Sequence, residues 1–375
     1  MESSKDHHDP GGGFRNPWDS YQKRSTLSLF GSIRKDPEKG EFVSSMFCRR
    51  HLFCAISLTA DVAALMLLAG RPDFNIIGSS QRKKARSIAA TWIGHCTFVV
   101  QMDGGNFLTD PIWSMRCGSF PGPKRVVPPP CELDELPSLD AILITSNRPD
   151  HLDKTTVQNL GNRAEWFVPL GVGEFLREHG VTRYTEMDWW ESRKLERGAT
   201  VVCTPSQHFS GRNAKDRDEA LWCSWTVVGP SSRFFFSGST GYRSKNKKGS
   251  RQDRDLLDRQ DYGRENGVAI GEFLPKCPAF RQIGRQYGPF DVAFLPIGGY
   301  GPKSVMSAVN AEPLDSVGIH RDVGAKCSVA MNWGTFQLSD EELLDPLREL
   351  EKALIDKRVP ESSFLIMKHG KTQII

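Results

Sequence analysis

Short apolar runs bounded by turn-forming residues recur along the chain from Ile88 onward. Runs of this length, rich in valine, isoleucine and phenylalanine, are typical of buried strands. The strands expected on this basis are Cys96–Gln101, Ala141–Thr145, Thr200–Thr204, Arg233–Phe236, Asp291–Ile297 and Ser328–Met331. Helical patterns separate some of them, and alternating strands and helices indicate a layered α/β fold.

Two helical patterns are clear enough to place. A short helix is expected at Gly173–His179, and a longer one at Asp340–Lys357. In the second, Ser339 and Glu342 have the spacing of a capping box, and five leucines fall on one face. Pro346 lies inside this pattern, so it either kinks the helix or marks its true start.

The chain divides into an N-terminal part, residues 1–87, and a domain, residues 88–375. Residues 1–40 are rich in glycine, proline and charge, which predicts a flexible arm. The apolar stretch 52–70 is nearly long enough to span a membrane but carries Asp61, so an interfacial or buried helix and a poorly packed stretch remain alternatives. Residues 243–276 are almost all polar and predict a long surface insertion.

Composition narrows the functional classes. The net charge is only +4, from 49 Lys and Arg against 45 Asp and Glu, which argues against nucleic acid as a partner. Nine scattered cysteines without a C-x-x-C pair predict neither a disulfide framework nor a zinc ribbon. Together with a polar N-terminus, they indicate a reducing, intracellular location.

A series of short phrases in a fixed order carries a resemblance to a known family. They are TWIGHCTF (91–98), FLTDPIW (107–113), SNRPDHLD (146–153), TPSQH (204–208), FFFSGSTGY (234–242), GPFDVAFLPIGGYGP (288–302), NWGTF (332–336) and KHG (368–370). Their order resembles the N-acylphosphatidylethanolamine-hydrolysing phospholipase D family of the metallo-β-lactamase superfamily. The resemblance implies an αββα sandwich and a dinuclear zinc site on loops at one sheet edge. It also implies a phospholipid substrate and peripheral attachment to a membrane surface.

The resemblance also assigns seven metal-ligand positions, through a loop H-x-H-x-D-H, a histidine after a strand, a bridging aspartate and a final histidine. Two zinc ions held in this way supply a hydroxide and positive charge for phosphodiester hydrolysis. Three positions keep their residues here, namely Asp150, His151 and His208, of which Asp150 and His151 are also the candidate catalytic residues. Four are substituted, namely Ser146, Arg148, Ser239 and Asn332. Losing four ligands is expected to weaken metal binding severely.

Two further substitutions bear on the substrate. A family histidine of the substrate pocket corresponds to Asn310. Arg148 places a guanidinium that cannot lose its proton where a metal ion would be bound. It could bind a phosphate group, since its planar donors match phosphate oxygens, or it could point to solvent without a role.

The remaining candidates have structural interpretations. His95 is expected in the core or behind a ligand, His320 in a helix and His369 in a loop. Asp110 is expected to orient a loop, or to hold a metal ligand in place. Cys203 lies on an apolar strand and is expected to be an inert buried thiol.

These observations leave three functional hypotheses. The first is a catalytically impaired or inactive homologue of the zinc-dependent phosphodiesterases that act on N-acylated phospholipids. The second is a residually active metal-dependent hydrolase that uses Asp150, His151, His208 and Asn332. The third is a non-catalytic protein that binds phospholipid in the old pocket.

Overall fold

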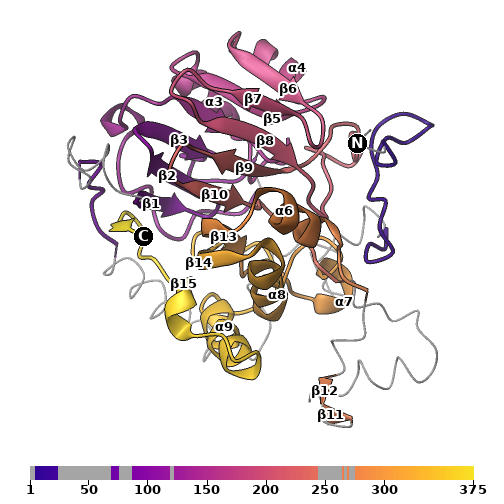
Figure 1. Cartoon of the computed structure of the whole chain (residues 1–375). Coiled ribbons are helices and arrows are strands. Elements are labelled where there is room, and N and C mark those ends of the chain that lie inside the picture. The colour runs from indigo at the N-terminus through magenta and orange to yellow at the C-terminus, as the bar shows by residue number, and fades with distance from the viewer. Residues whose placement is uncertain are drawn as a thin grey trace, which may run out of the picture.

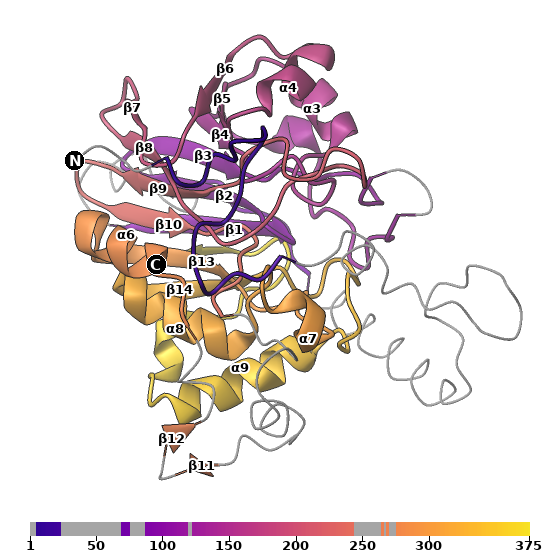
Figure 2. The same cartoon turned by 90° about the vertical axis from the view of Figure 1, so that its right-hand side faces the viewer.

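The structure is a computed structural model that describes residues 5–23, 69–75, 87–118, 122–243, 264–265, 268–269 and 275–375. Two seven-stranded sheets face each other, and helices cover their outer faces (Figure 1). Figure 2 shows α3 and α4 on one side of the sheets and α6, α8 and α9 on the other. This is the αββα sandwich that the family resemblance implies, and it agrees with the layered α/β fold that the strand and helix pattern predicts.

The first sheet has the order β16-β1-β2-β3-β4-β5-β6. Its first four strands are antiparallel and its last four are parallel, with β3 common to both halves. The strands are β16 (Thr372–Ile374), β1 (Ile88–Gly94), β2 (Thr97–Met102), β3 (Gly105–Thr109), β4 (Ala141–Leu143), β5 (Glu165–Pro169) and β6 (Tyr184–Met187).

The second sheet has the order β15-β14-β13-β10-β9-β8-β7, with the same division into a parallel and an antiparallel half. The strands are β15 (Phe364–Leu365), β14 (Ala325–Met331), β13 (Phe290–Pro296), β10 (Arg233–Phe236), β9 (Ser224–Val228), β8 (Thr200–Thr204) and β7 (Ser192–Lys194). A separate pair, β11 (Arg264–Glu265) and β12 (Val268–Ala269), lies within the insertion. All six predicted strands are confirmed within three residues at each end.

Alternation along each strand divides the buried side chains between the two layers of core. In β2, Phe98 and Val100 face the second sheet, whereas Val99 packs toward the outer helices. The ring of Phe98 lies 4.8 Å from that of Phe294, centroid to centroid, and the ring of Phe107 lies 5.5 Å from that of Phe234. These aromatic contacts join the two sheets.

The outer helices are α3 (Lys154–Leu160), α4 (Gly173–Glu178), α6 (Ala279–Tyr287), α7 (Lys303–Met306), α8 (Pro313–Val323) and α9 (Asp345–Asp356), with 3-10 turns η1 (Leu133–Glu135) and η3 (Glu361–Ser363). The short helix predicted at Gly173–His179 is confirmed as α4. Of the two alternatives at Pro346, the structure shows the true start of the helix rather than a kink, because α9 begins at Asp345 with Pro346 in its first turn and not at Asp340. The capping box was also wrong, since the Ser339 hydroxyl binds the Glu341 side chain instead.

The N-terminal part is described only in pieces. Residues 5–23 lie against the domain with His7 and Ser20 buried, where a flexible arm was expected. Residues 51–68, almost all of the apolar stretch, lie outside the described residues. Among the helices that the structure does describe, none is both long and apolar enough to cross a bilayer.

The polar insertion leaves and rejoins the domain at one point. Arg243 and Lys276 pair as an antiparallel bridge, and the buried Arg243 side chain forms an ion pair with Asp315. Most residues between these ends lie outside the part of the chain that the structure describes.

Candidate active site

The seven predicted ligand positions lie on loops that follow four strands of the two sheets. The loop after β4 carries Ser146, Arg148, Asp150 and His151 and leads into α3. The loops after β8, β10 and β14 carry the remaining three, His208, Ser239 and Asn332. The structure brings His208 close to the first loop, since the rings of His151 and His208 lie 6.3 Å apart, centroid to centroid.

Asp110 holds His151 in a fixed orientation. Nδ1 of His151 lies 2.7 Å from Oδ2 of Asp110, and both side chains are fully buried. The backbone N–H and the hydroxyl of Thr145 also donate to this carboxylate, each at 2.7 Å. Asp110 therefore fills both expected roles, since it orients the loop after β4 through Thr145 and holds a candidate ligand in place through His151.

Asp150 is surrounded by cationic and histidine side chains. Nε of Arg148 donates to its Oδ1 at 3.0 Å, while Nε2 of His151 and Nε2 of His95 lie 3.3 and 3.5 Å from its Oδ2. Burial alone raises the pKa of this carboxyl, but Arg148 and His151 outweigh burial and hold it well below its usual range. Asp150 is therefore a buried carboxylate whose charge is balanced within the chain.

His151 is the second cation of the cluster. Burial lowers its pKa, but the charges of Asp150 and Asp110 more than compensate and raise it to about 9. At neutral pH both ring nitrogens then carry hydrogens, so Nδ1 donates to Asp110 and Nε2 lies 2.9 Å from the hydroxyl of Ser239.

Arg148 points into the site. Its side chain is 19% exposed, it forms the ion pair with Asp150, and its guanidinium lies 4.4 Å from the centre of the Phe209 ring. The alternative in which Arg148 faces solvent without a role is therefore wrong.

His208 is held as a neutral ring. Its Nδ1 donates to the carbonyl of Val309 at 2.8 Å, and burial, reinforced by Arg148 and His151, lowers its pKa well below the usual range. Its Nε2 is buried and has no hydrogen-bond partner among the described residues. His208 therefore keeps a lone pair on Nε2 that accepts no hydrogen bond from the described residues.

The other three predicted residues, Asn332, Asn310 and Ser146, have amide or hydroxyl side chains. Asn332 adopts a left-handed backbone (φ 64°), donates from Nδ2 to Gly298 and leaves Oδ1 buried without a partner in the described chain. Asn310 is half-buried and donates to the carbonyl of Gly299 at 2.6 Å. Ser146 is buried, with its hydroxyl 3.5 Å from the backbone nitrogen of Arg148.

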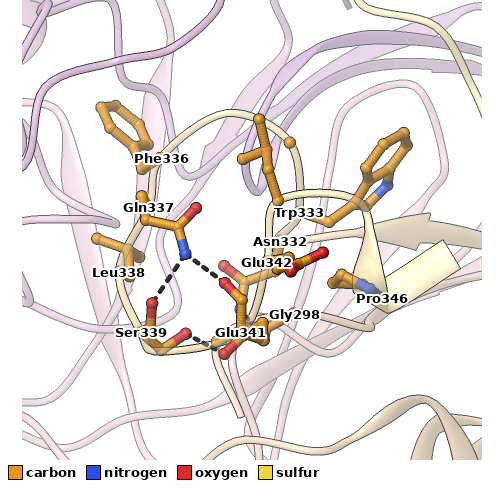
Figure 3. Close-up of a pocket in the computed structure, with 13 residues that line it drawn as sticks. Gly298, Asn332, Trp333, Phe336, Gln337, Leu338, Ser339, Glu341, Glu342 and Pro346 are labelled. Carbon is orange, nitrogen blue, oxygen red and sulfur yellow. Dashed lines mark hydrogen bonds between the residues drawn. The ribbon is translucent and has the colours of Figure 1, made fainter. Parts of the chain in front are cut away.

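A small pocket borders Asn332 (Figure 3). Its cavity volume of about 20 Å³ is enough for a water molecule but not for a lipid. The carboxylate of Glu341 lines this pocket and accepts hydrogen bonds from the backbone of Gly299, Tyr300 and Gly301. Figure 3 shows how Ser339 and Gln337 hold the Glu341 loop in place.

His95 lies behind the candidate ligand Asp150, in agreement with the expected position in the core or behind a ligand. It is buried in the turn between β1 and β2, with Nε2 facing Asp150. Donor atoms of His95, Cys96 and His151 lie within 4.8 Å of one another. The signal that could have identified it is a histidine at a tight turn, where its own φ is 53°.

The residues present do not fit the two-metal centre that the resemblance implies. Asp150, which corresponds to a metal ligand of the family, is already paired with the guanidinium of Arg148. Four of the seven ligand positions hold Ser146, Arg148, Ser239 and Asn332. A metal ion would add positive charge beside a guanidinium that cannot lose its proton. The features that favour a metal are the lone buried nitrogens of His95 and His208 and the oxygen of Asn332.

The remaining expectations for single residues agree with the structure. His320 lies in α8 and bonds to Ser328, and His369 is a buried loop residue stacked on Trp92. Cys203 is buried, and desolvation raises the pKa of its thiol.

Comparisons with known proteins place this geometry in a family. A model of the beta-lactamase superfamily domain matches residues 105–257. The N-acyl-phosphatidylethanolamine-hydrolyzing phospholipase D 1 of Caenorhabditis elegans is 33% identical over 75% of this chain and 74% of its own length. The mitochondrial phospholipase D of the same name from Saccharomyces cerevisiae is 30% identical over 70% of this chain and 50% of its own.

Solved structures agree on the fold. An isothiocyanate hydrolase from Delia radicum gut bacteria has a TM-score of 0.54 at 16% identity, over 76% of this chain and 98% of that one. A possible metal-dependent hydrolase from Veillonella parvula has a TM-score of 0.52 at 16% identity, over 77% and 99%. The resemblance to metal-dependent hydrolases supports a metal cofactor for the family, and the donor set of this chain departs from it. By fold, motif order and sequence identity, the chain belongs to the N-acylphosphatidylethanolamine-hydrolysing phospholipase D family of metallo-β-lactamase-fold hydrolases.

Proposed function

We propose that this chain is a homologue of the N-acylphosphatidylethanolamine phospholipases D in which metal-dependent phosphodiester hydrolysis is impaired or lost. The observation that carries the proposal is the ion pair between Arg148 and Asp150. It places a fixed cation of the chain itself against a carboxylate that corresponds to a metal ligand in the family.

The chemistry explains why this substitution matters. Two metal ions generate a hydroxide at neutral pH and stabilise charge on the phosphoryl oxygens. A guanidinium can supply the second effect but not the first, because it cannot lower the pKa of a coordinated water. Ser146, Ser239 and Asn332 also occupy ligand positions, and none of the described side chains around Asp150 would replace a metal ion as the source of hydroxide.

The proposed ligand is a phospholipid. The planar donors of Arg148 suit a phosphate group, and the imidazolium of His151 adds positive charge beside it. Asn310 is the proposed substrate-contacting residue on the opposite loop. A phospholipid ligand would bring an intracellular protein of this kind to a membrane surface.

A second candidate function rests on the buried nitrogens of His95 and His208, which lack partners among the described residues. In this candidate, His208 would hold a metal ion together with Asp150, His151 and Asn332 once Arg148 leaves Asp150, and the ion would support residual hydrolysis.

Turnover and metal content, measured together, decide between the two. Tag-free protein, saturated with zinc and dialysed, is assayed with N-acylphosphatidylethanolamine vesicles, with the His208→Ala variant as the matched control. Impairment predicts no turnover and the same zinc content in both proteins. If the wild type turns over the substrate, and both the turnover and one bound zinc ion are lost in His208→Ala, the second candidate is supported and the first is overturned.

A further inference from the structure

A cluster of two histidines and an aspartate lies apart from the loops of the active site. Nε2 of His7 is 2.6 Å from Oδ1 of Asp188, and Nε2 of His8 is 2.8 Å from Oδ2 of the same carboxylate. Asp188 lies in the turn between β6 and β7, which joins the edges of the two sheets. Two histidines that are adjacent in sequence therefore converge on one carboxylate 180 residues away.

Aromatic packing holds the three side chains in this arrangement. The ring of His7 is buried and stacks on Trp189 at 4.2 Å between centroids. The ring of His8 packs edge-to-face with the rings of His7 and Phe14, at centroid distances of 4.6 and 5.1 Å. The backbone N–H of Trp189 also donates to Asp188. The donor atoms are thus oriented before any ligand arrives.

Two imidazoles and a carboxylate form a donor set that suits zinc, and the donor atoms lie within 4.8 Å of one another. His8 is 35% exposed on its side chain, which leaves a path for a metal ion and room for a water as fourth ligand. Lys5, whose Nζ is 3.9 Å from Asp188, is 70% exposed and free to turn away. We propose that His7, His8 and Asp188 bind a zinc ion that fastens residues 5–23 to the domain.

The fastened segment reaches the loop that carries His208. Nδ2 of Asn16 donates to the backbone carbonyl of His208 at 2.8 Å, and the hydroxyl of Ser20 bonds to Gln207. Trp18 stacks on Trp189 at 5.4 Å. Zinc at the cluster therefore orders a strap that supports one wall of the candidate active site, independently of whether that site is catalytic.

The test uses the full chain without an affinity tag and zinc chloride as the probe. Equilibrium dialysis is compared for the wild type, His8→Ala and Asp188→Asn, with His179→Ala as the matched histidine control outside the cluster. The wild type and His179→Ala are expected to bind one zinc ion. The zinc affinity of both cluster variants is expected to be at least roughly tenfold lower.

Two further measurements separate this site from the other one. Zinc is expected to slow proteolysis within residues 5–23 of the wild type but not of His8→Ala, and His208→Ala is expected to retain the ion. A wild type that binds no zinc, or a His8→Ala variant that binds as much as the wild type, would overturn the proposal. Zinc lost only in His208→Ala would assign it to the active site and likewise overturn this inference.

Discussion

At the scale of single residues, the charge balance around Asp150 should determine stability as well as chemistry. Replacing Arg148 with alanine leaves Asp150 buried with His151 as its main cation. We expect the free energy of unfolding to fall by about 2 kcal/mol, below the cost of a fully buried pair because the Arg148 side chain is 19% exposed. Urea denaturation measures this loss.

Arg177→Ala is the control, because Arg177 pairs with Glu174 on the surface and should contribute less than about 0.5 kcal/mol. Equal effects of the two substitutions would contradict the proposed role of Arg148.

His369 predicts a measurable dependence of stability on pH. Burial, with a smaller contribution from Arg125, lowers its pKa from 6.5 to about 3. As the pH falls, the unfolded chain therefore takes up the proton before the folded chain does. The free energy of unfolding is at its full value above pH 6.5 and decreases as the pH falls toward 3. We expect His369→Gln to reduce the slope of unfolding free energy against pH in this window by up to about 1.4 kcal/mol per unit. Identical slopes for both proteins would show that His369 does not titrate in this way.

The sequence could assign Asp150, His151 and His208 to one site because motif order carries that information. It could not show that Arg148 turns toward Asp150 and Phe209 rather than toward solvent, since that depends on contacts between loops far apart in the chain. For the same reason it did not place His95 beside Asp150.

At the scale of elements, one side chain fixes the loop that precedes α9. The Glu341 carboxylate accepts from the backbone N–H groups of Gly299, Tyr300 and Gly301. Glu341→Ala leaves these donors without their acceptor, and we expect a loss of about 1–3 kcal/mol in the free energy of unfolding.

The neighbouring Glu342 provides the comparison. It bonds to Arg348 at an exposed position, so Glu342→Ala should cost less than about 1 kcal/mol in the same denaturation experiment. A larger effect at Glu342 than at Glu341 would contradict this view of the loop.

The strands were predictable because their apolar runs are local and long enough to exclude alternatives. The leucine pattern left the start of α9 open, because it extends past Pro346 toward the N-terminus. Only the structure shows that the helix begins at Asp345 and that Ser339 and Glu341 belong to the preceding loop. Residues 5–23 were missed because their partners, Asp188, Gln207 and His208, lie far away in the chain.

At the scale of the whole molecule, restoring the family ligands should restore metal binding. The variant combines Ser146→His, Arg148→His, Ser239→Asp and Asn332→His. Ser239 already lies 2.9 Å from His151, so an aspartate there would return negative charge next to the retained histidine. We expect two additional zinc ions, raised thermal stability in zinc and hydrolysis of N-acylphosphatidylethanolamine.

No single one of these substitutions should restore zinc binding and hydrolysis, because each metal site would still lack a ligand. Two bound ions without turnover would direct attention to Asn310 or to the insertion 243–276. Failure to bind zinc at all would show that the residue correspondence is wrong.

The bridge between Arg243 and Lys276 makes the length of the segment between them nearly irrelevant to the fold. The entropy of closing a loop changes by only about 0.6 kcal/mol for each doubling of its length. Exchanging residues 244–275 for a short glycine–serine linker should therefore leave the melting temperature within a few degrees of the wild type, as calorimetry would show. A much larger drop would mean that the segment contributes to the folded core. Relatives that differ in length here would need no compensating change elsewhere, so this junction is a natural place for the chain to gain or lose whole segments.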